Sequence, residues 1–285
     1  MRNPPMRELR IDTAHGQMAA LRAGREGAPR VLAVHGWLDN AASFVPLLEH
    51  LADFDVVAID LPGHGYSFHR PPGASYGLAE YLDDLLNALD AMGWSRCHVL
   101  GHSLGGAISS MLAGAAPERV EKLALIEALG PLAGAPGSAV ERLRLAVSER
   151  RALRSKQLRT FPDIFTAVRA RVQANGLSEH AARLLVERGI APVEGGFLWR
   201  SDPRLTTTTA LRADEGTIRE WIAGIEAPTL VIAAEQAPPY FDPALRAARV
   251  ACLRDGRCLQ LAGGHHLHME TPEPVAAAVA GFLAG

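Results

Sequence analysis

Residues 101–105 read Gly-His-Ser-Leu-Gly, and these residue types at this spacing could present a nucleophilic serine. An apolar run at 97–100 precedes them and small residues follow at 107–113, which predicts a strand, a sharp turn and a helix. Glycines beside Ser103 allow close packing in such a turn, so its hydroxyl projects above the sheet edge. An ordinary serine in a glycine-rich turn is the alternative, but the flanking pattern favours a nucleophile.

A serine hydroxyl needs a base within hydrogen-bond reach before it can attack a carbonyl carbon. Residues 263–272 contain three histidines after two glycines and before the last predicted helix. In an open α/β sheet, this loop lies at the carboxyl ends of the strands, where sites form. His265 is the predicted base. His266 and His268 are alternatives, His268 also as a partner for Glu270, and a metal site ranks last.

The third group is an acid that orients the base and stabilises its protonated form. Its usual place is the turn after the strand predicted at 229–233, but Ala237 stands where an aspartate is expected. Glu127 follows the next strand after the serine turn and leaves the sheet on the same side as Ser103. Glu127 is therefore the predicted acid, with a salt bridge at the cap hinge as its alternative role. Glu235 is the fallback acid.

Acyl transfer also needs N–H donors for the oxygen that becomes negatively charged. The backbone N–H of Leu104, directly after the serine, is one expected donor. Residues 35–37 read His-Gly-Trp at the end of an earlier predicted strand, and the N–H of Trp37 is the second expected donor. Trp37, His102 and Trp199 are expected to line a substrate pocket.

The elements that would position these residues alternate between strands and helices. Apolar runs predict strands that are buried on both faces, and helix-spaced apolar residues predict the helices between them. The expected elements are a hairpin over 9–21, strands at 31–34, 56–59, 97–100, 120–126, 229–233 and 258–261, and helices at 44–51, 78–92, 243–252 and 274–283. This order predicts an α/β fold with a mostly parallel sheet and helices on both faces.

The alternation breaks between Pro131 and about Trp221, where the pattern is helical without an obvious strand. We predict an α-helical cap at 131–221, inserted into a core formed by residues 1–130 and 222–285. Residues 141–159 carry seven Arg or Lys against two Glu. A solvated helix face accounts for this run better than a surface that attracts anionic substrates.

The composition bounds the class of protein. The chain has 285 residues, of which 48% are hydrophobic and 21% charged, which fits a soluble globular protein. A net charge of −2 gives no indication of nucleic acid or an anionic membrane as partner. We expect no signal peptide, no membrane span and a cytoplasmic location. Cys97, Cys252 and Cys258 lack metal-type spacing and are expected to be buried small residues.

Several motifs together resemble the α/β-hydrolase fold superfamily over nearly the whole chain outside the cap. They are residues 35–37, 60–67 (Asp-Leu-Pro-Gly-His-Gly-Tyr-Ser), 101–106 and 264–265 with Glu270 and Pro272. Longer matches at 35–44, 127–131 and 199–204 resemble its serine hydrolase-like group. The resemblance implies a Ser103 nucleophile, a His265 base and a helical cap. Some haloalkane dehalogenases of the superfamily place their acid where Glu127 stands, but those enzymes and epoxide hydrolases use an aspartate nucleophile.

The expected function is hydrolysis of a carboxylic ester through an acyl-enzyme on Ser103, without a cofactor or metal. The same groups serve thioesterases, amidases, carbon–carbon bond hydrolases and acyltransferases. A binding protein on a hydrolase fold is the alternative from a different class. The expected partner is a small-molecule acyl substrate, and the sequence does not indicate an oligomeric state.

Overall fold

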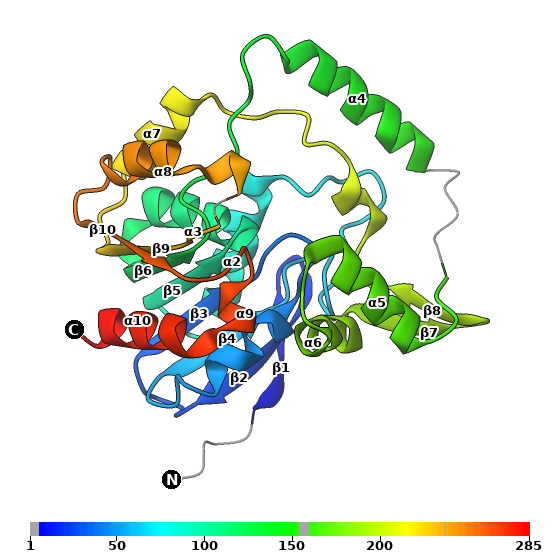
Figure 1. Ribbon diagram of the computed structural model, residues 1–285, viewed down its shortest axis with the longest axis horizontal. Coiled ribbons are helices and arrows are strands. Elements are labelled where there is room, and N and C mark those ends of the chain that lie inside the picture. The colour runs from blue at the N-terminus through cyan, green and yellow to red at the C-terminus, as the bar shows by residue number, and fades with distance from the viewer. Residues whose placement is uncertain (1–5, 154–159, 237) are drawn as a thin grey trace.

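A computed structural model describes residues 6–153, 160–236 and 238–285 of the chain. In these ranges eight strands form one sheet in the order β1-β2-β4-β3-β5-β6-β9-β10 (Figure 1). The strands are β1 (Arg7–Thr13), β2 (Gly16–Gly24), β3 (Arg30–Val34), β4 (Asp55–Ile59), β5 (Cys97–His102), β6 (Val120–Ile126), β9 (Thr229–Ala234) and β10 (Gly256–Leu261). All neighbours from β4 to β10 pair in parallel, whereas β2 is antiparallel to both β1 and β4. The predicted mostly parallel sheet is confirmed.

The central strands are covered on both faces. Every residue of β4 and of β5 is buried, which explains why the sequence has continuous apolar runs there rather than alternation. β10 lies at the edge of the sheet, and Cys258 on it is exposed. The expectation of three buried cysteines is therefore wrong: Cys97 is buried, but Cys252 is only partly so.

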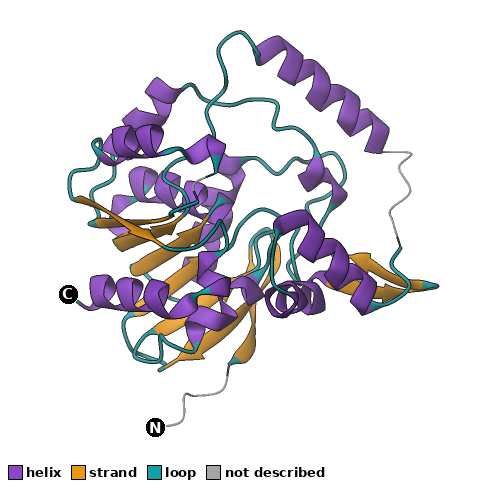
Figure 2. Ribbon diagram, viewed as in Figure 1, coloured by secondary structure: helices purple, strands orange, loops and turns teal. Residues whose placement is uncertain are grey.

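Helices cover both faces of the sheet (Figure 2). On one face, side chains such as Leu85, Ile108 and Ile218 form an apolar core with the strands. This face carries α2 (Leu78–Ala91), α3 (Leu104–Ala115) and α7 (Glu215–Ala223). On the other face, Phe44 and Val279 belong to a second core. That face carries the short helices η1 (Ala41–Phe44) and α1 (Val45–Leu48) together with α10 (Pro272–Ala284).

The chain between β6 and β9 contains the predicted helical insertion. Its helices are α4 (Ala139–Ala152), α5 (Ile164–Asn175) and α6 (Glu179–Gly189). The Ser178 side chain caps the start of α6. Helix α7, which begins inside the expected cap range of 131–221 and ends beyond it, packs on the core through Ile218 and Ile222.

The expectation that this region contains no strand is wrong. A hairpin of β7 (Ile190–Val193) and β8 (Gly196–Trp199) lies in the insertion, with a turn at Gly195 that has a φ of +81°. Each strand has only four residues, and Pro192 interrupts the first, so no alternation of apolar and polar residues marks them. Phe197 and Trp199 of β8 pack against the buried cluster of α5 and α6.

Helix α4 stands apart from the rest of the insertion (Figure 1). Of the residues that the structure describes in α4, Ala146 alone is buried. Val140, Leu143 and Val147, whose spacing is typical of a helix, are each about half exposed. The carboxylate of Glu149 accepts a hydrogen bond of 2.6 Å from the backbone N–H of Thr208. Arg154, Lys156 and Arg159, which belong to the basic run at 141–159, lie outside the described residues.

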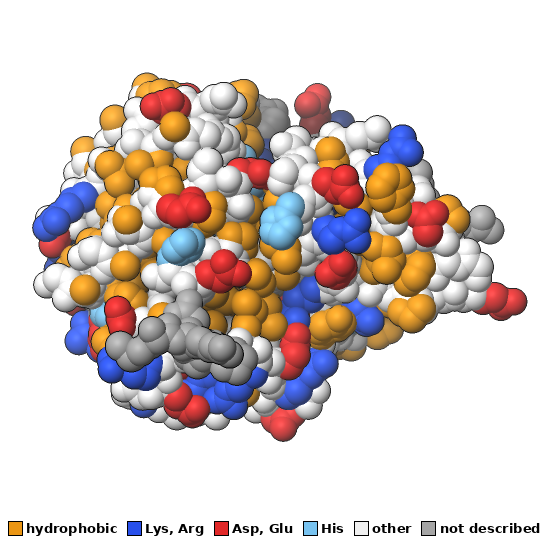
Figure 3. Space-filling model, turned by 60° about the horizontal axis from the view of Figure 1, so that its bottom comes forward, with side chains coloured by type: hydrophobic (Ala, Val, Ile, Leu, Met, Phe, Trp, Pro, Cys, Tyr) orange, Lys and Arg blue, Asp and Glu red, His pale blue; other side chains and the backbone are white. Residues whose placement is uncertain are grey.

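The surface carries charges of both signs. On the face in Figure 3, Lys and Arg side chains lie among Asp and Glu, in keeping with the net charge of −2. Within the described ranges, every helix is too short or too polar to cross a membrane.

Candidate active site

Ser103 lies at the sharp turn between β5 and α3. Its backbone has a φ of +51° and a ψ of −115°, a conformation that L-residues rarely adopt. A Cβ on Gly105 would lie 2.0 Å from the carbonyl oxygen of Val34, and one on Gly101 would lie 2.7 Å from that of Gly105. The two glycines therefore let β3, β5 and α3 approach closely enough to hold this turn. The predicted strand, turn and helix are all present.

His265 contacts the serine from the loop after β10. Its Nε2 lies 2.9 Å from Ser103 Oγ, although 162 residues separate them in the sequence. The carbonyl oxygen of His265 accepts a hydrogen bond of 2.9 Å from Nε2 of His102, which ties the loop to the end of β5. The His265 side chain is 26% exposed and Ser103 is partly exposed, so both residues are accessible to solvent.

Glu127 follows β6 and faces the other nitrogen of the same imidazole. Its Oε2 lies 3.3 Å from His265 Nδ1, and its side chain is fully buried. Its Oε1 accepts a hydrogen bond of 2.6 Å from the backbone N–H of Ala234, at the end of β9. Since one oxygen is held by the adjacent strand, the other is fixed in its orientation toward the ring.

Glu235, the fallback acid, lies elsewhere. Its side chain is exposed, and its backbone N–H donates to the carbonyl oxygen of Leu261 at 2.9 Å. Among the described residues, Glu127 supplies the one carboxylate within ion-pair distance of His265. Ala237, where an aspartate was expected, lies outside the described residues.

The two backbone N–H groups expected to act as donors belong to Leu104, which directly follows Ser103, and to Trp37 in the loop after β3. Within the described ranges, the N–H groups of Trp37 and Leu104 have no hydrogen-bond acceptor. Leu38 has a φ of +58°, and its N–H donates to His64 Nε2 at 3.3 Å, which holds the loop after β3. The Trp37 side chain is 53% exposed, and its indole N–H donates to the carbonyl oxygen of Leu205 at 2.9 Å.

The three residues expected to line a substrate pocket have different surroundings. His102 is fully buried, and its Nε2 donates to the carbonyl oxygen of His265. Trp199 lines a cavity of about 20 Å³ between the insertion and the core, together with Asn40 and Arg171. That volume holds about one water molecule. Trp37 is the member of the three that is half exposed.

The other two histidines of the C-terminal loop do not contact Ser103. His266 Nε2 lies 3.5 Å from a carboxylate oxygen of Asp39. His268 is fully buried with its ring centroid 4.0 Å from that of His102, and burial lowers its pKa to about 3. Glu270 is not its partner: neither ring nitrogen of His268 has a hydrogen-bond partner in the described ranges, and the Glu270 carboxylate accepts from the Ser178 N–H at 2.8 Å. Nowhere in the described ranges do three or more His, Cys, Asp or Glu side chains form a metal-binding group.

Sequence reasoning missed Tyr240 at this site. Its hydroxyl oxygen lies 3.5 Å from His265 Nε2, on the same nitrogen that faces Ser103. The side chain is half exposed, and partial burial raises the pKa of Tyr240 above its ordinary value of 10.0. An aromatic residue in the segment after β9 was the one available signal.

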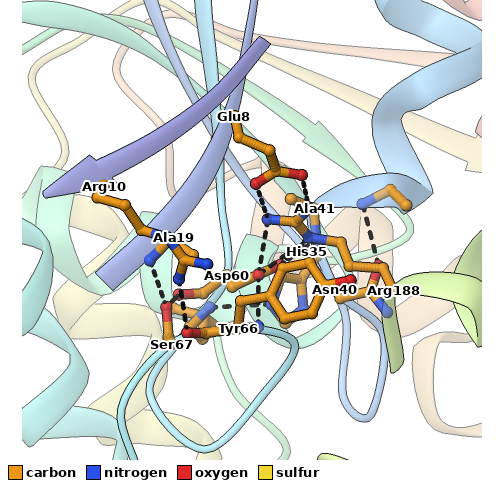
Figure 4. Close-up of polar contacts among 12 residues, drawn as sticks. Glu8, Arg10, Ala19, His35, Asn40, Ala41, Asp60, Tyr66, Ser67 and Arg188 are labelled. Carbon is orange, nitrogen blue, oxygen red and sulfur yellow. Dashed lines mark hydrogen bonds and ion pairs between the residues drawn. The ribbon is translucent and has the colours of Figure 1, made fainter. Parts of the chain in front are cut away.

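A buried ion-pair network joins the insertion to the loops that follow β3 and β4 (Figure 4). Arg188 of α6 donates to both oxygens of the buried Asp60 carboxylate at 3.0 and 2.9 Å, and it also pairs with Glu8. Asp60 in turn accepts hydrogen bonds from the N–H groups of Ala41 at 2.7 Å and Tyr66 at 2.8 Å. The insertion is therefore joined to the loops that follow β3 and β4.

Comparisons with known proteins show which family the chain belongs to. The alpha/beta hydrolase fold family matches residues 29–272. The chain belongs to this family. Serine hydrolase-like protein 2 of Homo sapiens is 31% identical over 303 residues, which cover 97% of this chain and 93% of the relative.

Two solved structures are similar over nearly the whole chain. A hypothetical protein of Pseudomonas aeruginosa is 40% identical with a TM-score of 0.92, covering 99% of this chain and 100% of its own. The thioesterase domain from the curacin biosynthetic pathway is 26% identical with a TM-score of 0.86, covering 99% of both chains. This chain is thus a serine hydrolase-like member of the alpha/beta hydrolase fold family.

Proposed function

We propose that this hydrolase cleaves small carboxylic esters through an acyl-enzyme on Ser103. The observation that carries the proposal is the contact of 2.9 Å between Ser103 Oγ and His265 Nε2, with the buried carboxylate of Glu127 on Nδ1 of the same ring. A hydroxyl, an imidazole and a carboxylate in this order form an activated nucleophile.

The proposed reaction uses these groups in two steps. Ser103 Oγ attacks the ester carbonyl while His265 Nε2 takes its proton, and the carbonyl oxygen becomes an anion held by the N–H groups of Trp37 and Leu104. His265 then donates the proton to the leaving alcohol, and the acyl-enzyme forms. Water attacks the acyl-enzyme with the same base, which releases the acid. Glu127 stabilises the imidazolium in both steps.

A thioester is the second candidate substrate. The curacin thioesterase domain matches 99% of this chain at 26% identity, and its name describes thioester cleavage. The proposed steps are the same for both substrates, since a thiol, protonated by His265, leaves in place of the alcohol. The relative kcat/KM for an oxyester and a thioester of the same acyl group decides between them.

The first test is removal of the proposed nucleophile. Ser103→Ala is expected to abolish hydrolysis of p-nitrophenyl acetate and labelling by a fluorophosphonate probe. Ser109→Ala is the matched control, because Ser109 is a buried serine on the same helix α3 whose hydroxyl has no hydrogen-bond partner among the described residues. Full hydrolysis by Ser103→Ala, or labelling of another residue, would refute the proposal. A wild-type protein that the probe does not label supports a non-catalytic binding protein instead.

A further inference from the structure

Asp39 lies in the loop that carries one of the two free N–H groups. It follows Trp37 by two residues, and its backbone N–H donates to the carbonyl oxygen of Gly36 at 3.2 Å, which closes the turn. Its side chain is 1% exposed. A Cβ on Gly36 would lie 3.0 Å from Asp39 Oδ2 and 2.9 Å from His102 Nδ1. The carboxylate is thus packed directly beneath this turn.

The same carboxylate oxygen faces the neighbours of the serine and of the base. Asp39 Oδ2 lies 3.7 Å from Nδ1 of His102, the residue before Ser103. It also lies 3.5 Å from Nε2 of His266, the residue after His265. Three segments that are far apart in the sequence, the loop after β3, the end of β5 and the loop after β10, therefore meet at one oxygen atom.

The other carboxylate oxygen binds the insertion. Arg171 of α5 forms an ion pair with Asp39 Oδ1, and the Arg171 side chain is 11% exposed. Burial alone would raise the pKa of Asp39, but the hydrogen bond from His266 and the charge of Arg171 outweigh it and hold that pKa well below its usual range. A buried carboxylate that stays ionised needs such a cation, because an unpaired charge in this environment is strongly destabilising.

We propose that Asp39 is a positioning residue that fixes the relative positions of the Trp37 N–H, Ser103 and His265. Arg171 makes these positions depend on the docking of helix α5. The inference rests on the proposed function, since it concerns the same three groups. Asp39 itself contacts neither Ser103 nor His265, so its effect passes through the adjacent residues. A displacement of about 1 Å among reacting groups can lower a rate about a hundredfold.

The test compares Asp39→Asn with a matched buried pair at the opposite end of the sheet. Arg22 donates to the buried Asp55 at 2.7 and 2.6 Å, and Asp55 lies at the amino end of β4, away from the site. Asp39→Asn is expected to lower kcat for p-nitrophenyl acetate and the rate of fluorophosphonate labelling together, about ten- to a hundredfold, with little change in KM. Asp55→Asn is expected to lower Tm while the folded protein keeps its kcat.

Arg171 provides a second route if Asp39→Asn does not fold. Arg171→Gln is expected to lower kcat and the labelling rate in the same proportion, and Arg171→Lys to restore part of both because it returns the cation. Equal kcat in wild type, Asp39→Asn and Arg171→Gln would overturn the inference while leaving the proposed function standing. So would a loss in KM alone, or a loss that Asp55→Asn reproduces in kcat. A wild-type protein that the probe does not label overturns the proposed function itself, and the inference with it.

Discussion

Glu127 combines a strained backbone with a fully buried carboxylate. Its φ of +58° is unusual for a residue with a side chain, and such a conformation costs about 1–3 kcal/mol. This backbone conformation directs the side chain from the end of β6 toward His265, where its two oxygens contact the Ala234 N–H and the imidazole. Strain of this kind accumulates where the surrounding structure fixes one side-chain orientation.

At the residue scale, Glu127→Gln is expected to lower kcat by about 10³–10⁴. The amide oxygen accepts from the Ala234 N–H, so the NH₂ group faces His265 Nδ1. That arrangement favours the tautomer with the proton on Nε2, which then cannot accept the proton of Ser103. Steady-state hydrolysis of p-nitrophenyl acetate measures the loss, and circular dichroism checks the fold.

Glu235→Gln is the control for this substitution. Glu235 is exposed, and within the described ranges it forms no ion pair with His265, so its kcat is expected to stay within about twofold of wild type. A larger loss of kcat at Glu235 than at Glu127 would reverse the assignment of the acid.

At this scale, the site residues that can be predicted from the sequence are those that belong to motifs. Ser103, His265 and Glu127 could be predicted because each follows a strand whose apolar run is visible, and parallel strands end at one edge. The buried position of His102 and the contact of Asp39 with Arg171 could not. They depend on how an inserted helix packs on three loops, which no local pattern encodes.

At the scale of elements, the junction of β3, β5 and α3 positions the serine. Its tightness comes from glycine, since a Cβ on Gly105 would lie 2.0 Å from the backbone oxygen of Val34. Backbone atoms cannot rotate away as a flexible side chain can, so α3 must move if this position gains a side chain. The same movement displaces the Leu104 N–H.

Gly105→Ala is therefore expected to lower the free energy of unfolding by about 1–3 kcal/mol or more. It should also slow fluorophosphonate labelling of the protein that remains folded. Gly281→Ala is the matched control in α10, where a Cβ would meet nothing within 4 Å. That change is expected to stabilise the protein by about 0.5–1 kcal/mol, because alanine favours helix. Urea denaturation measures both, and equal effects of the two substitutions would contradict this account.

The elements of the core could be predicted more fully than those of the insertion. Strands buried on both faces leave continuous apolar runs, and the helices between them keep a regular apolar spacing. The hairpin of β7 and β8 leaves neither signal, because its strands are short and contain Pro192. The spacing in α4 predicts a helix correctly, but Leu143 and Val147 on it remain about half exposed.

At the scale of the whole molecule, buried histidines make the fold sensitive to acid. His35, His64 and His268 are fully buried, and burial lowers their pKa values from 6.5 to about 4, about 3 and about 3. In the unfolded chain these imidazoles bind protons below about pH 6.5. Because the unfolded state then binds more protons than the folded state, the free energy of unfolding falls as the pH decreases from about 6.5.

Each of the three imidazoles is expected to reduce that free energy by about 2 kcal/mol between pH 7 and pH 5. Urea denaturation at the two pH values measures the total. His268→Gln should remove about one such contribution from the pH dependence, whereas His50→Gln on the surface should leave it unchanged. An equal or higher stability at pH 5 would show that these histidines are not neutral in the folded protein.

The position of Glu127, directly after β6, also has a consequence for engineering this hydrolase. The carboxylate that faces the imidazole accepts a main-chain hydrogen bond from Ala234, the last residue of β9. The described part of the segment after β9 carries Tyr240, whose hydroxyl lies near the ring, and no acid that contacts it. Changing the length of the segment between Glu235 and Tyr240 should therefore shift the Tyr240 hydroxyl relative to His265, while Ser103, His265 and Glu127 stay in place.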